Sequence, residues 1–157
     1  MTPSAVSKLK APFAMAVATL GIFLSAPAFA RAPEIYTSPF SKVAVGGYDP
    51  VAYFADKRPV KGDARYATTW KGTEFRFASP QNLAKFKAAP ANYAPQYGGY
   101  CAWAVSNGYT AKGDPLAWKV VAGKLYLNYD LGVQKRWEAD IPGNISRADG
   151  NWPRVLK

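Results

Sequence analysis

The feature that most constrains the fold is one pattern that recurs at a constant spacing of 51 residues. The tripeptide Lys-Gly-Asp at 61–63 returns at 112–114, and Gly72 returns as Gly123, without a gap. Self-similarity at a fixed period is typical of a repeated supersecondary unit. Any two hairpin-helix units share a turn glycine and a helix aromatic, but five identities at one register favour a duplication. Further pairs at this spacing are Phe75 with Tyr126, Ser79 with Asp130, Lys85 with Arg136, Phe86 with Trp137 and Ala88 with Ala139.

Each copy has the pattern of a hairpin followed by a helix. In the first copy, residues 64–78 alternate apolar and polar side chains around a turn at Lys71-Gly72, which predicts an antiparallel hairpin. Ser79 is then a helix N-cap, Pro80 suits the first helical position, and Pro90 ends the helix. The second copy predicts a hairpin over 117–129, a cap at Asp130 and a helix within 131–144. We therefore expect a small single α+β domain of two ββα-like units, built from antiparallel hairpins and short helices.

The segment between the copies, "APQYGGYCAWAVSNGY" at 94–109, holds the only cysteine of the chain, Cys101. Its "CAWAV" predicts either a short strand or the start of a helix that ends at Asn107-Gly108, because the apolar run is too short to decide. The tail after residue 144 carries Trp152, which we expect to pack back onto the domain.

The first thirty residues have the order of a secretory signal peptide. Lys8 and Lys10 precede an uncharged apolar run, and "AFA" places small residues before Arg31. We expect a Sec-type signal peptide over 1–30, cleavage after Ala30 and a periplasmic protein; an uncleaved N-terminal anchor is the alternative. Residues 31–42 would then be a leader, and 43–157 the domain with a C-terminal extension.

The formal net charge of +10 favours a soluble, well-charged surface with affinity for anionic surfaces, such as a lipid headgroup layer. Nucleic acid is excluded as a partner, because the chain carries an export signal and its basic residues are scattered rather than clustered. A single cysteine forms no intramolecular disulfide.

The residue types available for catalysis and metal binding are few. The chain has no histidine, and both methionines lie in the first thirty residues. A tetrahedral zinc site from one chain is therefore out of reach. No calcium-loop spacing, C-x-x-C pair or G-x-S-x-G elbow is present, so we favour a protein that is not an enzyme.

Three interpretations of Cys101 remain open. A free cysteine commonly packs as a small apolar side chain. The thiol would otherwise be a soft ligand for a copper ion or for a site shared with a partner chain, or it would form an intermolecular disulfide and hence a homodimer. Gly98 and Gly99 before it allow a backbone or a ligand to approach closely.

The stretch from "GGYDPVAYF" to "FRFASPQNLAKFKAAPANYAPQYGGYCAWAV" resembles the YHS domain. The chain from about 43 to 153 is similar to the exported, single-domain YHS proteins of Gram-negative bacteria. Asp49-Pro50-Val51 carries the family's Asp-Pro-Val, and the other matching positions are Phe77, Ser79, Phe86, Pro90 and Tyr93. The resemblance implies metal handling, with copper as the expected metal. Where family members often have cysteine, this chain has Ala52, Ala78 and Asn82.

Two functional hypotheses follow. The first is a non-enzymatic binding module that handles a metal, such as copper, with Cys101 and Asp49 as ligands. The second is a small-ligand-binding or protein-interaction domain that uses an aromatic, glycine-lined pocket and no metal. The residues predicted for that pocket are Tyr48, Tyr53, Tyr97, Gly98, Gly99, Tyr100 and Trp103.

Overall fold

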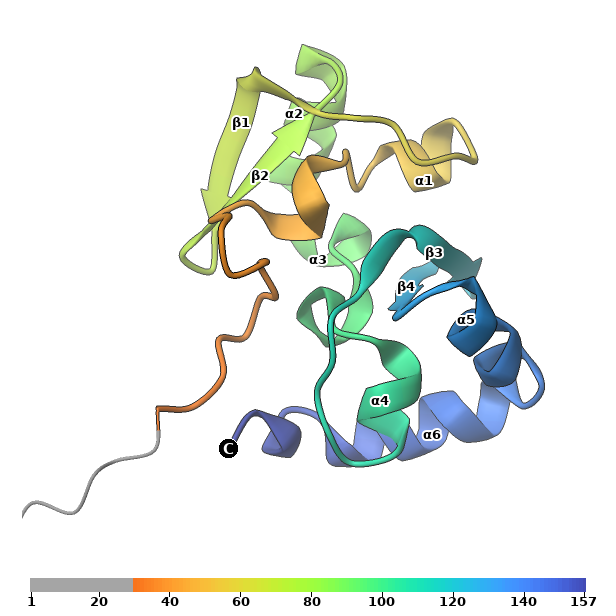
Figure 1. The fold of residues 1–157 in the computed structure, drawn as a ribbon. Helices are drawn as coiled ribbons and strands as arrows, with labels where there is room; N and C mark the ends of the chain where they lie inside the picture. The colour runs from red at the N-terminus through yellow and green to blue at the C-terminus, as the bar shows by residue number, and fades with distance from the viewer. Residues whose placement is uncertain (1–29) are drawn as a thin grey trace, which may run out of the picture.

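The structure, a computed structural model, describes residues 30–157; the predicted signal peptide lies outside the described residues except for Ala30. Figure 1 shows the first hairpin with α2 (Pro80–Ala88) at one end of the molecule and α6 (Ile141–Asn151) at the other, with the second hairpin between them beside α5 (Leu131–Glu138). Two hairpins and short helices confirm the small α+β fold. In the described part of the chain, none of the helices is both long and apolar enough to cross a membrane.

The first unit is arranged as the sequence predicts. After a 3₁₀ turn η1 (Ala44–Gly47) and a short helix α1 (Ala52–Ala55), strand β1 (Asp63–Trp70) pairs antiparallel with β2 (Thr73–Phe77). Helix α2 (Pro80–Ala88) begins where the Ser79 hydroxyl accepts a hydrogen bond from Asn82 N at 3.1 Å. Helix α3 (Pro90–Tyr93) follows, so Pro90 both ends α2 and begins α3.

The second unit repeats this order with its own 3₁₀ turn, η2 (Gln96–Gly99), and helix α4 (Ala102–Ser106). Strand β3 (Asp114–Val121) pairs with β4 (Lys124–Asn128), and α5 (Leu131–Glu138) follows the Asp130 cap. Both hairpins also carry an irregularity at the same place, between 63 and 67 and between 114 and 118. The repeated sequence therefore specifies a repeated backbone.

The sequence predicts a single helix within 131–144, but the structure has two helices in this region. Helix α5 ends at Glu138, and α6 (Ile141–Asn151) begins anew, because the Asp140 carboxylate caps the N–H of Gly143 at 3.0 Å. The chain then turns through η3 (Arg154–Leu156). Trp152 packs on the domain as predicted, with its ring 5.9 Å from that of Tyr97.

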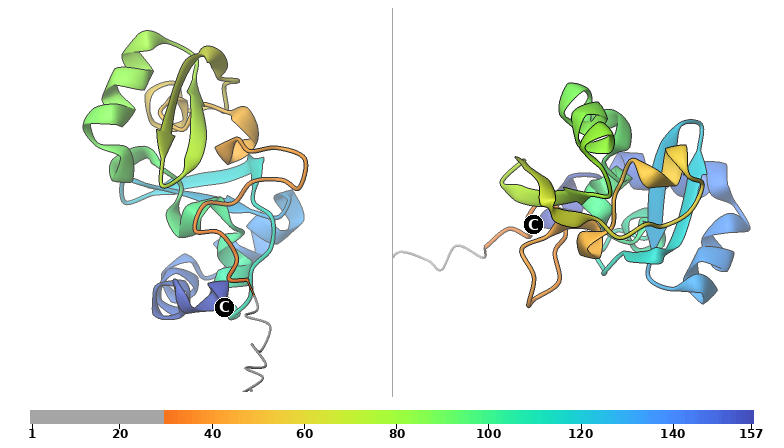
Figure 2. Two further views of the ribbon diagram at one scale, coloured as in Figure 1. Left: turned by 90° about the vertical axis from the view of Figure 1, so that its left-hand side faces the viewer. Right: turned by 90° about the horizontal axis from the view of Figure 1, so that it is seen from above.

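Strand β4 divides the apolar interior into two clusters. Leu125 and Leu127 pack with Phe75, Phe77 and other residues of the first unit. Tyr126, which points to the opposite face of the strand, packs with a second group that includes Trp137 and Val105. Both halves thus share one strand. The left view of Figure 2 shows the second hairpin, in cyan, between the first hairpin and the C-terminal helices.

Residues 31–42, the predicted leader, run along the second unit although they precede the first. Tyr36 N donates to Gly98 O at 2.9 Å, and Ala32 N donates to Leu156 O at 2.7 Å. The leader therefore joins the start of the described chain to its end.

Candidate functional site

Asp49 is a fully buried carboxylate whose oxygens are occupied by hydrogen bonds. Its Oδ1 accepts from Val51 N at 2.8 Å and from Ala52 N at 3.3 Å. Its Oδ2 accepts from Ala78 N at 2.8 Å and from Asn82 Nδ2 at 2.7 Å. The side chain thus ties the loop before α1 to the end of β2 and the start of α2, which is a structural role.

Cys101 lies at the N-cap of α4 with 1% of its surface exposed. Its Sγ accepts from Ala104 N at 3.5 Å, and the thiol donates to Oδ1 of the buried Asn128 at 3.8 Å. Burial raises the pKa of the Cys101 thiol, whereas hydrogen bonds from the backbone N–H groups of Ala104, Tyr129 and Trp103 act in the opposite direction. "CAWAV" is therefore a helix start, the second of the two conformations expected for it.

A cavity of about 260 Å³ opens in front of Cys101. Trp103 and Ala104 of α4 form one side, and Val133 and Arg136 of α5 form the other. Two partly exposed tyrosines, Tyr109 and Tyr129, complete the aromatic lining. An apolar cavity with a cation at one side suits a small molecule that has an apolar body and a negative group.

The residues predicted to line one pocket lie in several separate places in the structure. Cys101 and Trp103 share the cavity just described, whereas Tyr97 and Gly98 line a separate cavity of about 190 Å³. Tyr53 is fully buried in the first cluster, and its hydroxyl donates to Pro115 O at 3.0 Å. Tyr48 is half-buried, and Lys61 Nζ stands 4.0 Å from its ring centre.

The remaining pocket residues hold chain segments together. The Tyr97 hydroxyl donates to the Asp149 carboxylate at 2.8 Å, and the Tyr100 hydroxyl donates to Pro33 O at 2.8 Å. Gly98 has a φ of +61°, and a Cβ there would lie 1.7 Å from Glu34 O. Gly98 therefore admits the backbone of the leader, whereas a Cβ at Gly99 would meet the side chain of Pro95 at 3.2 Å.

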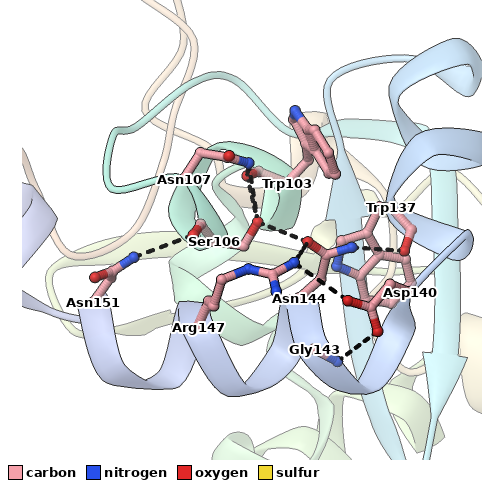
Figure 3. A network of polar contacts seen from close by, with 9 residues as sticks. All are labelled: Trp103, Ser106, Asn107, Trp137, Asp140, Gly143, Asn144, Arg147 and Asn151. Carbon is pink, nitrogen blue, oxygen red and sulfur yellow. Dashed lines mark hydrogen bonds and ion pairs between the residues drawn. The ribbon is translucent and has the colours of Figure 1, made fainter.

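A buried polar network between α4 and α6 was not foreseen from the sequence (Figure 3). Ser106 Oγ lies within hydrogen-bond distance of two acceptors, Trp103 O at 2.8 Å and Asn144 Oδ1 at 3.1 Å, and its single proton is available to either. Asn144 Nδ2 donates to Trp137 O at 2.9 Å. Arg147 donates to Asn144 Oδ1 at 2.7 Å. Asn144 lies in a helix that the sequence pattern did not separate from α5, so no local signal marked it as buried.

The donor set does not form a copper site within this chain. Among residues 30–157, no group of three or more His, Cys, Asp or Glu side chains is placed to hold a metal ion. The family's usual cysteine positions are occupied by Ala52 and Ala78, which bring no ligand atom, and by Asn82, which is bonded to Asp49. Among residues 30–157 Cys101 is the one soft ligand, and soft ions take two or more.

The protein is thus a small α+β domain with a repeated hairpin-helix unit and a cavity beside Cys101. Residues 51–97 match the model of the YHS domain. The matched range ends at the second glycine-rich turn and covers most of the first unit. No curated protein and no solved structure matches the chain.

Proposed function

We propose that this chain is an exported, non-enzymatic binding module whose ligand site is the cavity at Cys101. The observation that supports the proposal is the lining of that cavity, which brings aromatic side chains, a thiol and Arg136 around about 260 Å³ of space. The ligand class that fits is a small organic anion with an apolar or aromatic body, because stacking surfaces and one cation recognise those two features.

A copper-handling role, which the match to the YHS domain suggests, is the second candidate. It is favoured by the position of Cys101 on the cavity wall, where an entering ion would meet the thiol. Because the chain supplies one soft ligand, such a role requires further ligands from a partner molecule. The same requirement would be met by a second copy of this chain.

The experiment uses 2-naphthoate as the probe and follows backbone amide signals by NMR. We expect saturable shifts centred on Cys101 and Ala104, lost in Trp103→Ala and weakened several-fold in Arg136→Gln. The matched control is Lys135→Gln, which removes a charge from the neighbouring position of α5 and leaves the cavity lining intact. Shifts that centre elsewhere, or that survive Trp103→Ala, would contradict the proposal.

Copper is tested separately by titration with Cu(I) against a chelator. Stoichiometric uptake that Cys101→Ser abolishes, together with no response to 2-naphthoate, would replace the organic ligand with the metal. Uptake that is indifferent to Cys101→Ser would reject the copper candidate.

The proposal of export rests on the sequence of the first thirty residues. Expression of the full chain in a Gram-negative host tests it. We expect the mature protein in the periplasmic fraction with Arg31 as its first residue. A chain that keeps its N-terminus and stays in the membrane fraction would identify an uncleaved anchor instead.

A further inference from the structure

The first strands of the two hairpins, β1 and β3, occupy equivalent places in the two units. Each hairpin is a sheet of two strands, so β1 and β3 each have one edge without a strand partner. The far edge of β2 is flanked by the chain at Val43, which bridges to Glu74, whereas β1 lies on the outer side of the first hairpin (Figure 1). An open strand edge presents backbone N–H and C=O groups to which another chain can pair.

The hairpin turn fixes which backbone groups of β1 face this open edge. Both residues of the turn at 71–72 have positive φ, as in a two-residue turn of type I′. Trp70 and Thr73, which flank the turn, therefore form a hydrogen-bonded pair, and bonded pairs alternate with non-bonded pairs along the ladder. Ala67 and Thr69 belong to non-bonded pairs, so their N–H and C=O groups face away from β2. Within residues 30–157, no backbone group outside the hairpin bonds to either residue.

In the second unit, side chains of α5 close the equivalent edge. Gln134 Nε2 donates at 2.9 Å to Trp118 O, the carbonyl at the position of Ala67 in the first unit. This hydrogen bond agrees with the outward direction deduced for the Ala67 carbonyl. Lys119 Nζ of β3 pairs with the Glu138 carboxylate of α5 at 3.1 Å, so an ion pair also links the strand to the helix.

The first unit lacks these closing side chains. At the place of Gln134, helix α2 has Leu83, whose apolar side chain brings no donor to the Ala67 carbonyl. At the two places of the ion pair, the first unit has Thr68 and Lys87, which carry no opposite charges. The edge of β1 thus remains open where the edge of β3 is covered.

A cavity of about 190 Å³ lies at this open place, between β1 and α2. Its lining combines strand hydroxyls with an apolar wall and one cation: Thr68, Thr69, Trp70, Phe86, Lys87 and Pro90. Lys87 is exposed, α2 contains no Asp or Glu, and within residues 30–157 no acidic side chain pairs with Lys87. A negatively charged side chain is therefore the electrostatic complement of this cavity.

We propose that the open edge of β1 binds an extended peptide segment as a third strand of the first sheet, with an acidic side chain of the segment paired to Lys87. The segment does from outside what α5 does within the second unit. Its backbone N–H groups take the part of Gln134, and its carboxylate supplies the charge that Glu138 supplies there. The surface is separate from the cavity at Cys101, so the inference goes beyond the ligand proposed for that cavity.

The pleat of the sheet sets the side chains of the segment. Trp70 packs on Phe86 with ring centres 6.0 Å apart, so Thr68 and Trp70 point to the α2 side of the sheet. Every second side chain of an added strand lies on that same side. Main-chain bonds then provide affinity, and the alternate side chains provide selectivity. The fitting segment presents apolar and acidic residues alternately with polar ones, the apolar and acidic residues toward α2.

The test uses the hexapeptide acetyl-Thr-Val-Thr-Glu-Thr-Val-amide as the probe and follows backbone amide signals of the protein by NMR. We expect saturable shifts centred on Ala67 and Thr69, and binding that is several-fold weaker when lysine replaces glutamate in the peptide. A fully N-methylated form of the peptide donates no hydrogen bond and should not bind. No saturable shift, shifts centred outside β1 and α2, or binding that survives N-methylation would overturn the proposal.

Lys87→Glu tests the charge of the site, with Lys85→Glu as the matched control on α2 outside the cavity lining. We expect Lys87→Glu to prefer the lysine peptide and Lys85→Glu to keep the wild-type preference for the glutamate peptide. An unchanged preference in Lys87→Glu would overturn the proposal. A free protein that is dimeric through β1 and takes up no peptide would make a second copy the occupant and would also overturn it. Neither readout involves Cys101, so either result leaves the cavity proposal to its own experiment.

Discussion

Replacement of Asp49 by alanine tests whether this carboxylate anchors the first unit. The change removes the acceptor of four hydrogen bonds. Val51 and Ala52 are both buried. The Val51 N–H would be left without a partner, whereas the Ala52 N–H also donates to the backbone Asp49 O at 3.3 Å and keeps that bond. An unpaired buried donor costs about 1–3 kcal/mol. The other two donors, on Ala78 and Asn82, are only part-buried, so water replaces the acceptor there at smaller cost.

We therefore expect Asp49→Ala to lower the free energy of unfolding by about 2 kcal/mol, the middle of the range for one orphaned buried donor. Guanidinium denaturation measures this loss. If the midpoint falls while the slope of the unfolding free energy against denaturant concentration is unchanged, the variant has lost stability and nothing else. Asp49→Asn keeps one acceptor oxygen and should lose about half as much. Asp56→Ala, at an exposed aspartate in the same loop, is the control and should not move the midpoint. A loss for Asp49→Ala within about 1 kcal/mol of wild type would refute the anchoring role.

Three further predictions use the same fold. Phe86→Ala and Trp137→Ala remove fully buried aromatic side chains at equivalent positions of the two units. Each should lower the free energy of unfolding by about 3–5 kcal/mol in chemical denaturation. A loss in only one of the two variants would contradict equivalent packing in the two units. Gly98→Ala brings a Cβ against the backbone of the leader and should lower the melting temperature far more than Gly72→Ala, whose Cβ meets no atom although its φ is also positive. Burial and the hydrogen bond to a carboxylate raise the pKa of Tyr97, so its contribution to stability is present below about pH 10 and lost above it. Denaturation midpoints measured on both sides of pH 10 should fall less steeply in Tyr97→Phe, and an equal fall would refute this assignment.

Part of the candidate site was predictable from the sequence and part was not. Cys101 stood out as the single thiol, and it does line a cavity with Trp103. Two other contacts could not be predicted, because they join segments that are far apart in the chain: Gly98 lies against the leader, and the Tyr97 hydroxyl bonds to Asp149.

The sequence by itself determined the two hairpin-helix units, because their signals are local. A turn at Lys71-Gly72, a cap at Ser79 and a cap at Asp130 act on residues three or four positions away. Each of these elements lies where its pattern predicts it.

Tertiary structure alone decided how the units join and what surrounds the thiol. Strand β4 buries Leu125 and Tyr126 in different clusters, although both fit a half-buried strand equally well. Asn128 and Tyr129 approach Cys101 across 27 and 28 residues of chain. Contacts of this range form only when packing fixes the positions of whole elements, because no local backbone preference selects one distant partner over another.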